Sequence, residues 1–135
     1  RKFHEAKEKN SPTVKVWGTG EAMREFMHVD DLANACVHVL KECDFDKIYS
    51  QNISQINLGT GEEISIKNLA HLIARVVNYE GKIQFDTSKP DGTLRRVLDN
   101  KRINDLGWSH EINLEEGLKS TYEWFQNNLK NIKEI

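Results

Sequence analysis

The stretch Trp17–Ala35 reads WGTGEAMREFMHVDDLANA, and it contains the transition from strand to helix that decides the fold. The segment TVKVW (13–17) leads into this stretch and ends at Trp17. It alternates apolar and polar side chains, as strands do. The glycines at 18 and 20 indicate a turn, and REFMHV (24–29) predicts a second extended run. Asp30 or Asp31 is then expected to cap a helix, because apolar residues recur with helical spacing at 32, 36, 39 and 40.

The flanking sequence predicts further short strands mixed with helices. A helical pattern covers residues 1–10, and residues 43–54 are polar and irregular, as in a loop. The segments QINL (55–58) and KIQF (82–85) are expected to be strands. Helices are expected to begin at Ser65, Asp99 and Asn113, with Gly107 ending the second of them. This order lacks regular alternation of strand and helix, so it predicts a small mixed α/β lobe rather than a complete doubly wound domain.

The composition excludes several classes of protein. A chain of 135 residues with 38% hydrophobic and 30% charged residues suits one globular domain with a core. No apolar run approaches the roughly 18 residues of a membrane helix, and a net charge of −2 disfavours a nucleic-acid binder. Cys36 and Cys43 are too far apart on one predicted helix for a disulfide, which favours reduced thiols and a cytoplasmic location. The chain opens without methionine inside a helical pattern, so we expect it to derive from something longer.

Motifs for a cofactor, a metal ion or catalysis are absent from the sequence. Gly59-Thr60-Gly61 lies between a predicted strand and a helix, but the third glycine of a dinucleotide fingerprint would fall at Ile64. No tyrosine is followed four residues later by the lysine of a proton-transfer pair. The histidines and cysteines have no metal-binding spacing. We therefore predict no catalytic, cofactor-binding or metal-binding residue in these 135 residues.

Several residues favour the binding of an anionic ligand. Arg24 lies beside Met23 in an apolar neighbourhood, where a cation is costly without an anionic partner. Arg95 and Arg96 follow the loop Lys89-Pro90-Asp91-Gly92, and converging guanidinium groups suit a pyrophosphate. Trp17, at the end of a strand, could stack on a base or sugar. The alternative is that Arg24 pairs with Asp30 or Asp31 and that Trp17 lies in the core.

A resemblance to a known family is carried by VKVWGTGEAMREFMHVDDLANA (14–35), INLGTGEEISIKNLAHLIARVV (56–77), FDTSKPDGTLRRVLD (85–99) and LGWSHEINLEEGLKSTYEWF (106–125). These segments resemble the carboxyl-terminal lobe of the GDP-L-fucose synthase family, which belongs to the extended short-chain dehydrogenase/reductases of the NAD(P)-binding Rossmann superfamily. The resemblance implies that residues 1–135 are the lobe that binds a GDP-sugar, with the Rossmann core and the amino-terminal NADP-binding domain largely missing from this chain. For the intact protein it implies a cytoplasmic, homodimeric oxidoreductase and isomerase that uses NADP(H) to convert GDP-4-keto-6-deoxy-D-mannose into GDP-L-fucose.

The resemblance also implies which residues touch substrate, namely Lys2, Trp17, Arg24, Asp91 and Arg96. Trp17 and Arg24 match residues that contact substrate in the family, and Arg96 stands where a basic residue reaches the diphosphate. Lys2 replaces an arginine found in many members, which keeps the charge but loses its bidentate hydrogen bonding. Asp91 lies in the loop that closes over the nucleotide. Since the family's catalytic residues lie upstream, we expect these 135 residues alone to bind the GDP-sugar, to hold no cofactor and to be inactive.

Two other functions remain open at this stage. The chain could be the substrate lobe of another nucleotide-sugar epimerase, reductase or dehydratase, because its Trp-Gly-x-Gly and Arg-x-Phe-x-His-Val-x-Asp elements are shared across that group. It could also be a non-catalytic binding fragment. In each case we expect neither nucleic acid nor a membrane as partner, and we expect exposed apolar surface near Phe3, Phe26 and the Leu32 helix that favours self-association.

Overall fold

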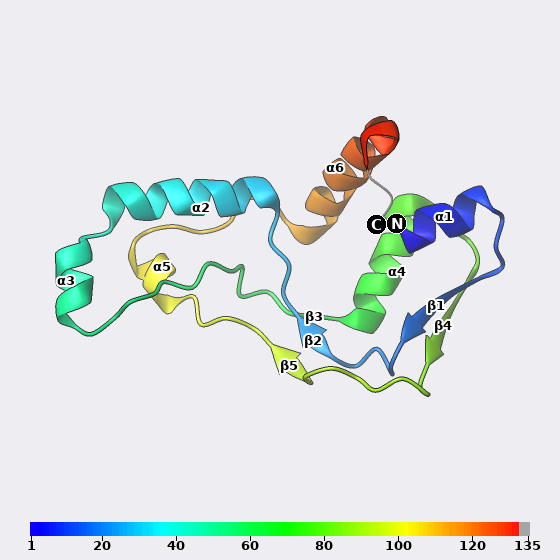
Figure 1. Ribbon diagram of the computed structural model, residues 1–135, viewed down its shortest axis with the longest axis horizontal. Coiled ribbons are helices and arrows are strands. Elements are labelled where there is room, and N and C mark those ends of the chain that lie inside the picture. The colour runs from blue at the N-terminus through cyan, green and yellow to red at the C-terminus, as the bar shows by residue number, and fades with distance from the viewer. Residues whose placement is uncertain (133–135) are drawn as a thin grey trace.

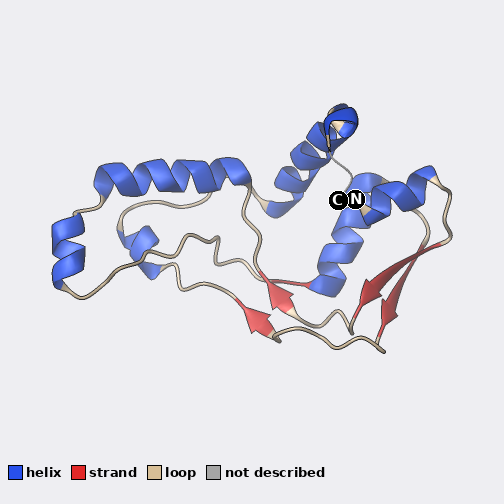
Figure 2. Cartoon of the chain, viewed as in Figure 1, coloured by secondary structure: helices blue, strands red, loops and turns tan. Residues whose placement is uncertain are grey.

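The computed structural model describes residues 1–132 and shows an elongated molecule of short strands and helices (Figure 1). The helices are α1 (Lys2–Glu8), α2 (Val29–Glu42), α3 (Phe45–Ser50), α4 (Ile66–Val77), α5 (Lys101–Asp105), α6 (Leu114–Asn127) and the 3-10 helix η1 (Leu129–Asn131). The strands are β1 (Thr13–Trp17), β2 (Met23–Arg24), β3 (Ile64–Ser65), β4 (Lys82–Asp86) and β5 (Arg95–Arg96). Figure 2 shows the strands at the centre and at one end, whereas α2, α3 and α5 form the other end. The predicted mixed α/β fold is confirmed.

The strands form two small sheets. In the first, β1 and β4 run parallel, with Val14 opposite Ile83 and Trp17 opposite Asp86. In the second, the order is β3-β2-β5, with β2 antiparallel to β3 and parallel to β5. A turn at residues 18–20 carries the chain from β1 to β2, so the two sheets are joined directly.

A first hydrophobic core lies where α4 meets α1, α6 and the β1–β4 sheet. Its buried residues are Phe3, Ala6, Val14, Ala70, Ala74, Val77 and Tyr79. The Phe3 and Tyr79 rings meet edge to face with centroids 5.7 Å apart, and the Tyr79 hydroxyl donates to the Ser11 carbonyl over 3.0 Å. The apolar surface expected near Phe3 is therefore not found at that residue, because its ring packs in the core against Tyr79, whereas Phe26 and Leu32 are exposed as expected.

A second core lies under α2 and fixes α5 in place. Ala35, Ile103 and Trp108 are its buried members, and Ile103 is fully buried. The Trp108 Nε1 donates to Asn34 over 3.3 Å, so the indole that fills this core also satisfies its own polar atom. Within residues 1–132, no helix is both long and apolar enough to cross a membrane.

Helix caps show where local sequence determined structure and where it did not. Ser65 and Asn113 cap α4 and α6 as predicted, accepting from the amides of Asn68 and Glu116. The prediction for α2 is wrong, since its N-cap is His28, whose Nδ1 accepts from the Asp30 amide at 3.3 Å. Asp31 is instead buried.

Other differences concern strands and helices that depend on distant partners. Residues 55–58 form no strand, because no described segment pairs with them, and residues 43–54 contain α3 rather than only a loop. Of the extended run predicted over residues 24–29, only Arg24 lies in a strand, because β3 and β5 pair with the chain only at Met23–Arg24, and Val29 already begins α2. α5 begins one residue after Asn100 rather than at Asp99. Both cysteines are free, Cys36 exposed and Cys43 buried.

Candidate anion-binding site

The pairing of β2 with β5 brings two arginines side by side. Arg24 and Arg96 are register partners in parallel strands, so their side chains leave the same face of the sheet. Like charges directly opposite each other in a sheet repel. Neither guanidinium group forms an ion pair with any residue in the range 1–132. This face therefore concentrates positive charge without an internal counter-ion.

On the opposite face of the same sheet, the arginine of β5 is paired with a carboxylate. Arg95, the neighbour of Arg96, hydrogen bonds through Nε and Nη2 to both oxygens of Glu63, which precedes β3. These hydrogen bonds lower the pKa of Glu63 and raise that of Arg95. Of the three arginines predicted to converge, only Arg24 and Arg96 are available for a ligand on one face.

The loop between β4 and β5 packs on Arg24. The Arg24 Nη1 donates to the Met23 carbonyl at 2.6 Å, and a Cβ added at Gly92 would lie 3.2 Å from the Arg24 Nη2. The Met23 amide also donates to the Leu94 carbonyl at 2.8 Å. The alternative in which Arg24 pairs with Asp30 or Asp31 is wrong, because neither carboxylate bonds to it.

Asp91 fastens the same loop to the turn that follows β1. Its carboxylate accepts from the Thr19 amide at 2.9 Å and from the Thr19 hydroxyl at 2.7 Å. The hydrogen bond from the hydroxyl, followed by that from the amide, lowers the pKa of Asp91. Gly18 has a φ of +80° and lies directly against Asp91, so a side chain there would be strained and would collide. The structure thus gives Asp91 an anchoring contact that the sequence did not indicate.

Trp17 and Lys2 border the same region. Trp17 is 67% exposed, so the alternative that it belongs to the core is wrong. The Lys2 Nζ lies 5.7 Å from the centre of the Trp17 ring, within the range of a cation–π contact. Trp17 leads into Gly18, Gly18 touches Asp91, and the residue after Asp91 touches Arg24. Pairwise contacts and the β2–β5 register therefore connect the five predicted residues, of which Lys2, Trp17 and Arg96 are exposed and Arg24 and Asp91 half-buried.

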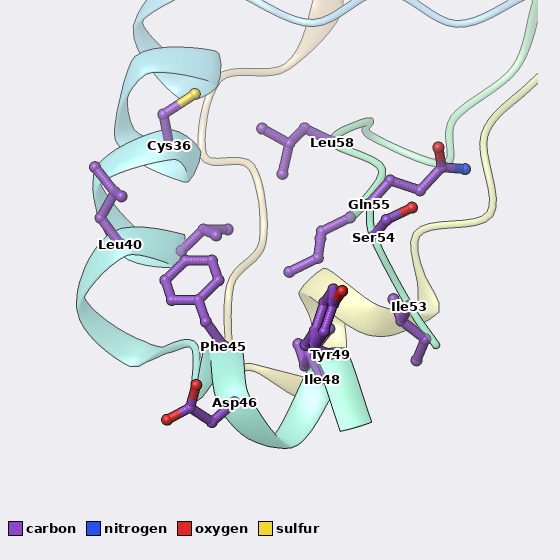
Figure 3. A pocket seen from close by; sticks show the side chains of 12 residues that line it. Cys36, Leu40, Phe45, Asp46, Ile48, Tyr49, Ile53, Ser54, Gln55 and Leu58 are labelled. Carbon is purple, nitrogen blue, oxygen red and sulfur yellow. The ribbon is translucent and has the colours of Figure 1, made fainter. Parts of the chain in front are cut away.

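A cavity of about 750 Å³ lies elsewhere, between α2, α3 and residues 53–58 (Figure 3). Apolar side chains such as Leu40, Phe45 and Tyr49 surround most of it, and Figure 3 shows the Tyr49 and Ile48 side chains along its wall. None of the five predicted residues lines it. Its apolar walls do not suit a diphosphate, so we place the candidate site at the arginine pair.

A hydrolytic site is not supported by the contacts of His28. Its Nε2 lies 3.2 Å from the Ser120 hydroxyl, and its Nδ1 lies 3.6 Å from an Asp30 oxygen. However, Nδ1 accepts from the Asp30 amide, so the neutral ring carries its proton on Nε2. That nitrogen cannot take the Ser120 proton, and His28 is a helix cap rather than a general base. The residues described hold no cluster of three or more metal-binding side chains.

The Gly59-Thr60-Gly61 turn does not fit a dinucleotide. Its Gly61 amide donates to the Glu25 Oε2 at 3.0 Å, so a carboxylate occupies a donor that a cofactor phosphate would need. A negative charge at that position would also repel the phosphate. Sequence reasoning missed Glu25 and the contact between Gly92 and Arg24, since both depend on segments far away in the chain.

Comparisons with known proteins agree with this architecture. Residues 1–59 match the NAD dependent epimerase/dehydratase family. The GDP-L-fucose synthase of Escherichia coli is 52% identical over 95% of this chain and 40% of its own length. A GDP-L-fucose synthetase of Naegleria fowleri bound to NADP covers 98% of this chain and 40% of its own, with a TM-score of 0.84 and 25% identity. A GDP-mannoheptose C4 reductase of Campylobacter jejuni with NADP bound covers 93% of this chain and 42% of its own, with a TM-score of 0.78 and 38% identity.

These matches span about two fifths of the length of each relative and nearly the whole of this chain. The agreement extends from sequence to fold, since the TM-scores of 0.84 and 0.78 cover almost the whole chain. The chain is therefore homologous to the carboxyl-terminal part of GDP-L-fucose synthases, and its first 59 residues match the NAD dependent epimerase/dehydratase family.

Proposed function

We propose that this chain is the substrate-binding lobe of a GDP-L-fucose synthase and that its arginine pair holds the diphosphate of a GDP-sugar. The observation that carries the proposal is the uncompensated charge of Arg24 and Arg96 on one face of the β3-β2-β5 sheet. A diphosphate brings two adjacent anionic groups, and each accepts planar hydrogen bonds from a guanidinium group. A bound diphosphate would thus remove the repulsion between the two arginines.

The neighbouring residues have distinct proposed roles. Trp17 offers an exposed aromatic face to the base or the sugar, with Lys2 adding a cation near the same ring. Asp91 uses its carboxylate to hold the β4–β5 loop against the turn at Thr19, which keeps Gly92 beside Arg24. The loop is thereby preorganised, and a preorganised site loses less conformational entropy on binding.

For the intact protein we propose NADPH-dependent epimerisation and reduction of GDP-4-keto-6-deoxy-D-mannose to GDP-L-fucose, in a cytoplasmic homodimer. The chain's contribution is to orient the sugar through binding energy from the remote nucleotide. The Gly59–Gly61 turn does not fit NADP(H), so the cofactor site is proposed to lie in an amino-terminal domain outside these 135 residues. The chain alone is accordingly proposed to be inactive.

Calorimetric titration of the 135-residue chain with GDP and with UDP tests the binding proposal. We expect GDP to bind more tightly than UDP. Tighter binding of UDP would favour the lobe of a different nucleotide-sugar enzyme, and the absence of binding to either would contradict the proposed function. A parallel assay should detect no NADPH oxidation by the chain with GDP-4-keto-6-deoxy-D-mannose, and turnover would refute its inactivity.

A further inference from the structure

Glu25 joins the backbone on both sides of β2. Its Oε2 accepts from the Gly61 amide at 3.0 Å, and its Oε1 accepts from the Leu98 amide at 3.1 Å. Gly61 lies in the segment that leads into β3, and Leu98 lies just beyond β5. A single carboxylate therefore spans the three-stranded sheet at the end of β2, one residue from Arg24.

The sheet needs such a connection because its strands are very short. β2 and β5 have two residues each, and sheets of so few paired residues have little stability of their own. The Arg95–Glu63 ion pair also crosses the sheet, but it involves an exposed arginine, and exposed ion pairs contribute little. Glu25 makes two charge-assisted hydrogen bonds to backbone amides, which are stronger.

Gly59 confines the Glu25 carboxylate. A Cβ added at Gly59 would lie 2.5 Å from the Glu25 Oε1 and 2.9 Å from the Asn100 Oδ1. The side chain of Asn100 is buried, so the carboxylate lies in a close-packed position beside it. Even one methyl group at Gly59 would therefore displace the carboxylate from its amides.

We infer that Glu25 is a positioning residue, which fixes the separation of Arg24 and Arg96 and thereby makes the site prefer a diphosphate over a monophosphate. The inference rests on the proposed function. Two cations at a fixed separation can each bind one phosphate of a diphosphate, whereas a monophosphate reaches one of them fully. Loss of the Glu25 hydrogen bonds lets the strands separate, and this weakens the two-phosphate contact more than the one-phosphate contact.

The experiment compares the affinities of the 135-residue chain for GDP and GMP before and after Glu25→Gln. Glutamine has the same shape but one oxygen, and its amide group cannot accept from the second backbone N–H. We expect the affinity for GDP to fall by about tenfold and the affinity for GMP to fall by less than about threefold. The ratio of GDP affinity to GMP affinity therefore falls. A purely electrostatic effect has the opposite sign, because removing a negative charge near the arginines strengthens the binding of both anions.

Glu63→Gln is the matched control, since it removes the same charge from the same sheet without touching the Gly61 and Leu98 amides. Its ratio of GDP to GMP affinity should not fall. Hydrogen exchange should be faster at the Gly61 and Leu98 amides in Glu25→Gln while thermal unfolding confirms that the variant is folded. If Glu25→Gln does not fold, two other variants should show the lower ratio of GDP to GMP affinity. They are Glu25→Asp, which keeps the charge on a shorter side chain, and Gly59→Ala.

The outcomes separate this inference from the proposed function. A folded Glu25→Gln protein with an unchanged ratio, beside a wild-type chain that binds GDP, overturns the role of Glu25 alone. A wild-type chain that does not bind GDP overturns the proposed function and the inference with it. A lower ratio in Glu25→Gln and Glu25→Asp, with no decrease in Glu63→Gln, establishes the positioning role.

Discussion

Arg24 and Arg96 lie opposite each other in parallel strands, and neither guanidinium group has a carboxylate partner within residues 1–132. Arg95, the residue before Arg96 in β5, is on the other face and pairs with Glu63. One face of the sheet thus carries an arginine that is paired with a carboxylate, and the other face carries two arginines that are not. Such an arrangement costs stability in the absence of an anion. The proposed diphosphate would account for this arrangement, and the difference between Arg95 and Arg96 provides a direct test.

Arg96→Ala should weaken GDP binding by about tenfold, roughly 1.4 kcal/mol, because it removes one of the two cations on the binding face. Arg95→Ala is the matched control, since it removes the same charge from the adjacent position on the opposite face. Calorimetry on both variants gives the comparison. Equal losses of affinity would indicate a general charge effect and would contradict a site on one face.

Arg24→Ala should weaken GDP binding by about 2–4 kcal/mol, the scale for removing one partner of a desolvated charge pair. Arg24→Lys should restore only part of the affinity, because an ammonium group cannot make two parallel hydrogen bonds. The melting temperature should change little, since Arg24 forms no ion pair with described residues and donates only to the Met23 carbonyl. A large loss of stability with unchanged affinity would instead assign Arg24 a structural role.

The Asp91 anchor should depend on pH. Hydrogen bonds from Thr19 lower the pKa of Asp91 in the folded chain, so the anchor stabilises the fold fully above the unfolded pKa of about 3.9. It is lost as the pH falls through the lower, folded pKa. NMR of the Thr19 amide during acid titration should report this change. Asp91→Asn should show no such step, and a Thr19 amide that does not respond in the wild type would contradict the anchor.

Local signals in the sequence predicted much of the fold. Ser65 and Asn113 were identified as caps because a cap acts on an amide three residues away. The strands of two residues could not be predicted, since they exist only through pairing between distant segments. For the same reason QINL (55–58) was wrongly assigned, because a strand pattern does not reveal whether a partner is present.

The candidate site shows the same limit. Sequence and resemblance selected Trp17, Arg24 and Arg96, but not which arginines share a face. That information lies in the register of β2 with β5, and a shift of one residue would have placed Arg95 beside Arg24 instead. Glu25 was also missed, since the two amides that it binds come from segments on either side of β2.

Asp31→Ala should destabilise the chain by about 1–3 kcal/mol through the loss of buried hydrogen bonds. Asp31 is 5% exposed, and its carboxylate accepts from the Glu111 amide at 3.2 Å and the Ile112 amide at 3.0 Å. It therefore ties α2 to the segment before α6. Asp30→Ala is the control, since that side chain is exposed. Chemical denaturation measures both variants, and equal effects would contradict the anchoring role of Asp31.

The apolar surface around the cavity in Figure 3 should make the 135-residue chain self-associate. Leu40 and Tyr49 are 73% and 78% exposed there, and apolar patches of several hundred Å² are seldom left open. We expect analytical ultracentrifugation to show association that increases with concentration, together with binding of a hydrophobic dye. Leu40→Gln and Tyr49→Ser should reduce both the association and the dye binding with little change in stability, because both side chains are largely exposed.

Leu94→Gln is the control, since Leu94 is as exposed as Leu40 but does not line the cavity. A monomeric wild-type chain without dye binding would refute the prediction, and an equal effect of Leu94→Gln would show that association does not depend on this surface.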